Sequence, residues 1–174
     1  MKKIIALVLC TILALTFTAC TAGDNADKAD KKGDTNTGSN TQITNPITDF
    51  DSIDEAAKAA DFDITAPDEI GSKKLTLIQG IKNADETGYD IISLSYGDGE
   101  IMLRKGRGAD DVSGDYNEYA DIAVDNIGGK SVTMRGIENK VYKATWTDGD
   151  FSYSVVADNG LSHEDISAIA TKLA

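Results

Sequence analysis

Residues 140–157, KVYKATWTDGDFSYSVVA, contain two runs of alternating apolar and polar residues on either side of Asp148-Gly149. Such alternation is typical of β-strands that bury one face. Asp-Gly is a strong signal for a two-residue hairpin turn. We therefore expect strands at 140–146 and 151–157, in which one set of side chains faces another across the hairpin: Tyr142, Ala144 and Trp146 opposite Phe151, Tyr153, Val155 and Ala157.

Further strand patterns precede this hairpin. Residues 75–81 predict one strand, and residues 90–96 and 100–105 predict a hairpin around Gly97-Asp98-Gly99. Residues 120–127 and 131–135 predict two more strands, joined at Gly128-Gly129. In the first hairpin we expect the apolar residues of each strand to share a face: Ile92, Leu94 and Tyr96, with Ile101 and Leu103 on the partner strand. The polar, glycine-broken residues 105–116 predict a loop.

A helix is predicted on each side of the strands. Ser52 and Glu55 have the spacing of a capping box, and Ser162 and Asp165 have it again near the end of the chain. After each cap, apolar residues recur at helical spacing, first Ile53, Ala56, Ala57 and Ala60, then Ile166, Ile169, Ala170 and Leu173. The expected fold is therefore α+β: a curved antiparallel sheet of about six strands, with an N-terminal and a C-terminal helix packed on one face.

Residues 1–19 have the pattern of an export signal. Residues 1–3 (MKK) are positively charged, and residues 4–15 are almost purely apolar. This run is too short for a transmembrane helix, which needs about 20 apolar residues. It fits the apolar region of a signal peptide instead.

Cys20 stands where a bacterial lipoprotein carries the cysteine that receives diacylglycerol. Residues 17–20 (FTAC) resemble the lipobox that precedes this modification, with Phe17 where leucine is commonest. We therefore expect a lipid on Cys20 that holds the chain at the extracytoplasmic face of the cell membrane. The alternative is a plain secretory signal cut near Ala19 or Ala22, in which Cys20 has no role.

The mature chain is expected to have two parts. Residues 20–45 are polar, with Ile43 as the one sizeable apolar residue, and such a segment cannot bury enough surface to offset its ordering entropy. They predict a disordered tether that carries a single globular domain, residues 46–174. Cys10 lies in the signal and Cys20 at the junction, so the domain has no cysteine for a disulfide or for a metal.

The globular domain is strongly acidic. It has 25 Asp and Glu against 12 Lys and Arg, a net charge of −13. Nucleic acids carry a dense negative charge, so this balance argues against nucleic-acid binding.

Residues 91–173 resemble domain-of-unknown-function family 4367, found in Firmicute lipoproteins and in membrane-anchored proteins that are like anti-sigma factors. Three segments carry the resemblance: a glycine turn at 124–129 (VDNIGG), a tryptophan hairpin at 144–155 (ATWTDGDFSYSV), and the helix start at 160–166 (GLSHEDI). Where the family usually has a second Glu in the last segment, this chain has Asp165. The resemblance implies an extracytoplasmic α+β domain and transfers no catalytic residue.

The sequence contains few candidates for catalysis. His163 is the only histidine and has no second histidine or cysteine to join it, so an exposed helix position is the expectation. The carboxylate pairs Asp110-Asp111 and Asp148/Asp150 lie in loops and turns, where a weak calcium site is the alternative to local hydrogen bonding. The basic cluster at residues 104–108 (RKGRG) is expected at a charged hairpin end. We therefore assign no catalytic residue, cofactor or metal.

Three functions remain compatible with the sequence. The expected one is a non-catalytic binding or sensing module that engages a protein, peptide or lipid. The alternatives are a carboxylate- or metal-dependent hydrolase and a scaffold subunit of an envelope regulatory complex.

Replacing Cys20 by alanine tests the predicted anchor. We expect Cys20→Ala to release the protein into the medium, because the alanine side chain cannot accept diacylglycerol. Fractionation of cells into membrane and medium measures this. If the variant stays with the membrane as well as the wild type does, the anchor prediction is wrong.

Overall fold

The computed structural model describes residues 44–82, 87–108 and 110–174. Cys20, the predicted signal and nearly all of the predicted tether lie outside the described residues. The described residues belong to one compact unit with two helices and nine strands. In chain order these are β1 (Ile47–Phe50), α1 (Ile53–Ala60), β2 (Glu69–Ile70), β3 (Lys73–Lys82), β4 (Tyr89–Tyr96), β5 (Ile101–Arg107), β6 (Asp121–Ile127), β7 (Lys130–Ile137), β8 (Lys140–Asp148), β9 (Phe151–Leu161) and α2 (His163–Lys172).

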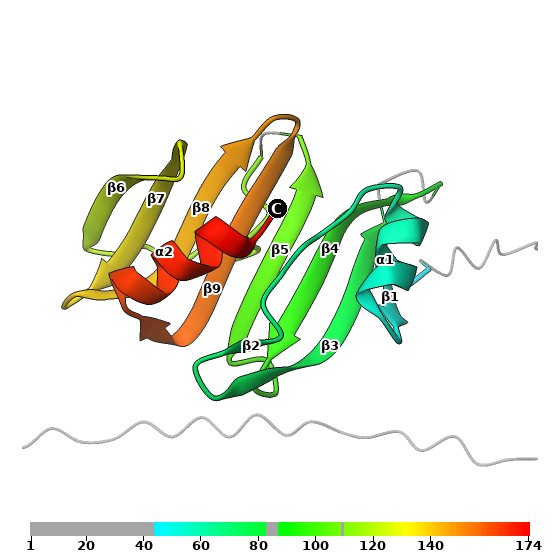
Figure 1. Cartoon of the computed structure of the whole chain (residues 1–174), viewed down its shortest axis with the longest axis horizontal. Coiled ribbons are helices and arrows are strands. Elements are labelled where there is room, and N and C mark those ends of the chain that lie inside the picture. Colours follow the sequence, from blue (N-terminus) through cyan, green and yellow to red (C-terminus); the bar gives the residue numbers. More distant parts are fainter. Residues whose placement is uncertain (1–43, 83–86, 109) are drawn as a thin grey trace, which may run out of the picture. The chain divides into compact units, whose positions relative to one another are not determined.

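The strands form one open antiparallel sheet in the order β1-β3-β4-β5-β9-β8-β7-β6, and β2 pairs with β3 (Figure 1). The expected antiparallel α+β fold is therefore observed in outline. The expected count of about six strands is wrong, because the described residues form nine. β1 and β2 have four and two residues, too few to show an alternating pattern in the sequence.

Two-residue turns set the register of three hairpins. Asp148 pairs with Phe151, so the turn between β8 and β9 consists of residues 149–150, one position after the predicted Asp-Gly pair. Ile127 pairs with Lys130 across Gly128-Gly129, whose φ angles are 60° and 88°. Residues 138–139 join β7 to β8 in the same way, with positive φ angles at a glutamate and an asparagine. Of the three turns, this last one carries no glycine signal in the sequence.

The core lies on one side of the sheet. Paired residues of five neighbouring strands form a row of buried side chains on this side: Leu94, Leu103, Val155, Ala144 and Met134. The buried residues of α1 and α2 belong to the same hydrophobic core. We call this the helix side of the sheet, and the opposite side the polar side.

Both helices begin at the predicted caps. At α2, Ser162 Oγ accepts a hydrogen bond from the Asp165 N–H, and the Asp165 carboxylate accepts one from the Ser162 N–H, which confirms the capping box. At α1, Ser52 Oγ accepts from the Glu55 N–H, but the Glu55 carboxylate accepts from Asp51 instead of Ser52. The reciprocal half of the first predicted box is therefore wrong.

The final hairpin contains a bulge that the alternating pattern does not reveal. Ala144 and Trp146 lie opposite Val155 and Tyr153, as expected. The register shifts between Val141 and Lys143, so Tyr142 leaves the row and stacks on Tyr119, with ring centroids 5.8 Å apart. The expected place of Tyr142 opposite the β9 core residues is wrong.

Lys105 is a buried cation on the helix side. Its Nζ donates to the Asp63 carbonyl at 2.7 Å and lies 4.5 Å from the ring centroid of Phe151 and 5.4 Å from that of Tyr153. Desolvation lowers the pKa of this ammonium, although the carboxylates of Asp63 and Asp148 partly oppose the effect. Lys105 thus fastens the segment after α1 to the sheet.

Replacing Lys105 by methionine should lower the free energy of unfolding. The variant keeps much of the apolar stem but loses the charge-assisted hydrogen bond and the contacts with the rings, worth about 1–3 kcal/mol. Urea unfolding monitored by circular dichroism measures the loss. The exposed Lys74 supplies the control, since Lys74→Met makes the same change at the surface of β3. Equal stability of the two variants would contradict the role given to Lys105.

Candidate functional site

The polar side of the sheet carries hydroxyl and cationic side chains in register. Paired residues form a row from β4 to β7 that contains Ser93, Arg104, Ser154, Thr145 and Thr133. These residues alternate along each strand with the buried core residues of the helix side, because successive side chains of a strand point to opposite faces. The same alternation that builds the core therefore builds a polar surface opposite it.

The connection from β5 to β6 runs across this surface. Arg104 Nη1 donates to the carbonyl oxygens of Val112 and Ser113, both at 3.1 Å, and its Nε donates to Ser93 Oγ. Burial lowers the pKa of the Arg104 guanidinium. Gly106 gives the connection room, since a Cβ there would lie 2.7 Å from Cγ1 of the buried Val112. The segment that follows is thus held against the sheet.

The predicted loop at 105–116 is only partly observed. Residues 105–107 belong to β5, where they pair with residues 151–153 of β9. These residues do not show the alternating pattern of a strand, because Lys105 and Arg107 lie on the helix side, where apolar residues are usual. The start of the predicted loop is therefore wrong, and the connection proper begins after β5.

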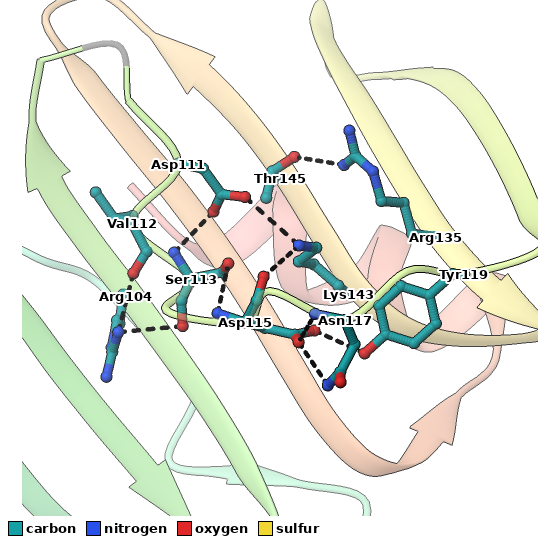
Figure 2. Close-up of polar contacts among 10 residues, drawn as sticks. All are labelled: Arg104, Asp111, Val112, Ser113, Asp115, Asn117, Tyr119, Arg135, Lys143 and Thr145. Atoms are coloured by element: carbon teal, nitrogen blue, oxygen red, sulfur yellow. Dashed lines mark hydrogen bonds and ion pairs between the residues drawn. The ribbon is translucent and has the colours of Figure 1, made fainter.

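Lys143 is the second cation that holds this connection. Its side chain is 7 % exposed, and Nζ lies 2.5 Å from the Asp115 carbonyl oxygen and 3.6 Å from the Asp111 carboxylate (Figure 2). Asp111 also accepts a hydrogen bond from the Ser113 N–H at 2.8 Å. Partial burial alone would raise the pKa of Asp111, but the hydrogen bonds from Ser113 and the charge of Lys143 outweigh it and lower the pKa.

Asp115 continues the network toward β8. Its carboxylate accepts hydrogen bonds from the Tyr119 hydroxyl at 2.6 Å and from the Asn117 backbone and side-chain amides. Partial burial would raise the pKa of Asp115, but these bonds and Lys143 lower it. The stacking of Tyr119 on Tyr142 then fixes the end of the segment on β8.

A hollow of about 360 Å³ opens beside this network, over β7, β8 and β9. Arg135 borders it on β7, and Figure 2 shows Thr145 between Arg135 and Asp111. Hydroxyl side chains from three strands and two carboxylates from the connection lie around it: Ser131, Thr133, Thr145, Thr147, Ser152, Asp110 and Asp111.

Several polar groups of the hollow have spare hydrogen-bonding capacity. Arg135 Nη1 donates to Thr145 Oγ1 at 3.3 Å, and no carboxylate of the described residues lies within ion-pair distance of its guanidinium. Within the described part of the chain, no hydrogen bond involves the side chains of Ser131, Thr133 or Thr147. The hollow therefore offers a guanidinium, several hydroxyls and two carboxylates to a polar molecule.

The structure separates the basic residues 104–107. Arg104 lies on the polar side, whereas Lys105 and Arg107 lie on the helix side, where Arg107 donates to the carbonyl oxygens of Ala60 and Asp61. The expected charged hairpin end is wrong, because adjacent residues of a strand face opposite ways. The turn between the strands β4 and β5 lies at the other end of β5.

The remaining candidates from the sequence lie apart from the hollow. His163 is half-exposed at the start of α2, with Nδ1 3.7 Å from the Asp125 carboxylate. Asp148 pairs with Lys130 on the helix side. In residues 44–82, 87–108 and 110–174, no group of three or more His, Cys, Asp or Glu side chains has the arrangement of a metal site. None of the helices described is long and apolar enough to cross a membrane.

Sequence patterns did not single out Arg135, Lys143 or the hydroxyl residues around them. A signal was present in the alternation itself, because residues 131, 133 and 135 on one strand and 143, 145 and 147 on another are all polar. Only the pairing of these strands shows that the two sets share one surface.

Replacing Asp111 by asparagine tests the network through its pH dependence. A carboxylate whose pKa is lowered by folding stabilises the protein above its unfolded pKa, about 3.9, and this stabilisation is lost as the pH falls through the folded pKa. Because the Asp111 side chain is half-exposed and solvent screens its charge, we expect Asp111→Asn to be less stable than the wild type by only about 0.2–1 kcal/mol at pH 7. The difference should shrink below about pH 4. Urea unfolding at neutral pH and at two acidic pH values on either side of the unfolded pKa measures it.

Asp110 supplies the control for this measurement. It is exposed and adjacent in sequence, but it does not bond to Ser113 or Lys143. Asp110→Asn should therefore leave stability nearly unchanged at every pH. A difference between Asp111→Asn and the wild type that is independent of pH would contradict the role given to the Asp111 charge.

No protein-family model, curated protein or solved structure matches this chain.

Proposed function

We propose that this chain is a membrane-anchored extracytoplasmic lipoprotein whose globular domain is a non-catalytic binding module. The export pattern of residues 1–19 and the position of Cys20 support the anchor. No family model bears out the resemblance of residues 91–173 to domain-of-unknown-function family 4367, which would imply the same extracytoplasmic location. In this proposal the polar residues 20–45 hold the domain away from the bilayer.

The single observation that carries the binding role is the polar hollow over β7, β8 and β9. Its volume of about 360 Å³ is within the range of small-molecule sites. Arg104 and Lys143 hold the bordering segment 110–115 in place without using the hydroxyls and the guanidinium that line the hollow. In this proposal the site is formed before any ligand arrives, which lowers the entropic cost of binding.

The lining favours a saccharide that carries a carboxylate or phosphate group. A guanidinium binds such groups through two parallel hydrogen bonds. The hydroxyls of Ser131, Thr133 and Thr147 can donate to and accept from sugar hydroxyls, and Asp110 can accept from them. This ligand class differs from the protein, peptide or lipid that the sequence favours, because the side chains on this side of β7 and β8 are polar.

The negative charge of the domain is compatible with an acidic ligand. At physiological ionic strength, charges further away than about 8 Å are largely screened. The local balance of the hollow and of the bordering segment 110–115 is neutral, since Arg104, Arg135 and Lys143 offset Asp110, Asp111 and Asp115. An acidic group at Arg135 therefore meets a cation that no carboxylate of the described residues neutralises.

Replacing Arg135 by glutamine tests the proposal. We expect the full-length protein in detergent to bind acidic saccharides on an array of acidic and neutral glycans. Arg135→Gln should weaken this binding about tenfold or more, because a desolvated charged hydrogen bond is worth about 1.5–3 kcal/mol. Arg135→Lys should restore the charge but only part of the affinity, because an ammonium lacks the two-pronged geometry.

Arg107 provides a matched control on the opposite side of the sheet. Arg107→Gln removes the same charge from the helix side and should leave glycan binding unchanged. The proposal fails if the wild type binds no acidic saccharide, or if Arg107→Gln weakens binding as much as Arg135→Gln does.

A further inference from the structure

The strand β6 is an open edge of the sheet. It ends the strand order and pairs with β7 alone among the described residues, through seven residue pairs without a bulge. In Figure 1 it forms the outermost strand at its end of the sheet. Each edge strand has backbone N–H and C=O groups that point away from its single neighbour and can pair with an added strand.

β6 has two charged residues, Asp121 and Asp125, but it lacks the other features that usually protect such an edge. It has no proline, no lysine and no bulge, and it is seven residues long. The opposite edge strand, β1, has four residues and follows Pro46. The two edges of the sheet therefore differ, and of these two only β6 offers a long regular strand.

Two apolar side chains on β6 are exposed on the polar side. Ile122 is 65 % exposed and Val124 is 60 % exposed. They lie opposite Arg135 and Thr133 of β7, so they form the outer border of the polar row. Alternating apolar side chains on an edge strand suit the side chains of an added strand.

The residues of β6 that point to the helix side indicate the charge that a partner strand should carry. Asp121 and Asp125 lie on the helix side of the strand. Among the described residues, the one ion pair that either carboxylate makes joins Asp125 to His163, which is charged only when protonated. A strand with Lys or Arg opposite these two carboxylates would add favourable pairs.

A second copy of the chain suits this edge less well, because β6 has no Lys or Arg to lie opposite Asp121 and Asp125 in any register. The antiparallel register that brings Ile122 opposite Val124 of another copy also brings Asp121 opposite Asp125, and symmetry repeats the conflict. Like charges directly opposite one another destabilise a strand pair.

We propose that β6 is a docking edge for an extended segment of a partner protein that alternates apolar residues with Lys or Arg. The segment adds one antiparallel strand to the sheet, with its apolar side chains against Ile122 and Val124 and its cations against Asp121 and Asp125. This interaction is separate from ligand binding in the hollow and does not require it.

A labelled peptide, about seven residues long to match β6, that alternates lysine and valine is the probe. Fluorescence anisotropy with the full-length protein in detergent should show saturable binding. A peptide with glutamate in place of lysine, and a lysine peptide N-methylated at every residue, should not bind. The first change reverses the charge, and the second removes the backbone donors that a strand pair needs.

Val124→Lys should weaken binding of the lysine peptide about tenfold or more, since it replaces an apolar contact by a like charge. Leu77→Lys is the matched control and should leave binding unchanged, because Leu77 is an exposed apolar residue on the polar side of β3. An absence of saturable binding, binding that Val124→Lys leaves unchanged, or binding that survives N-methylation would overturn the proposal. A wild-type dimer in sedimentation that Val124→Lys dissociates would also overturn it and assign the edge to a second copy.

Discussion

The antiparallel pairing of β5 with β9 determines both sides of the sheet at once. It brings Leu103 opposite Val155 on the helix side and Arg104 opposite Ser154 on the polar side. Because side chains alternate along a strand, a slip of one residue would expose the core row and bury the polar row. These two strands join the two flanks of the sheet, β1 to β4 on one side and β6 to β8 on the other.

Most of the cations that have a structural role in the described part of this acidic domain bind backbone carbonyl groups. On the helix side, Lys105 and Arg107 hold the residues after α1, and Lys130 donates to the carbonyl oxygens of Ala170 and Leu173 at the end of α2. On the polar side, Arg104 and Lys143 hold segment 110–115. Carbonyl oxygens that lie over a sheet have no ladder partner, so a buried cation satisfies them. These five cations thus hold the connecting segments and the end of α2 in place.

The two proposed binding regions lie on neighbouring strands, the edge on β6 and the hollow from β7 inward, and they differ in chemistry. The hollow presents polar side chains from the inner residues of β7, β8 and β9, whereas the edge presents backbone groups and two apolar side chains of β6. Thr133 and Arg135 lie between the two, opposite Val124 and Ile122. A small polar ligand and an extended segment would therefore use neighbouring surfaces without competing for the same atoms.

Local patterns in the sequence determined most of the strands, two of the tight turns and the helix caps. Alternation predicted the strands from residue 75 onward, and the spacing of Ser162 and Asp165 predicted the cap of α2. Gly-Gly predicted one turn correctly, and Asp-Gly predicted another one residue too early. These features depend on residues a few positions apart, so the sequence alone contains them. Tertiary structure decided the pairing of β5 with β9, the bulge at Tyr142, the separation of Arg104 from Lys105, and the meeting of Arg135 with Asp111 around one hollow. These features depend on contacts between residues far apart in the chain, which no local periodicity specifies.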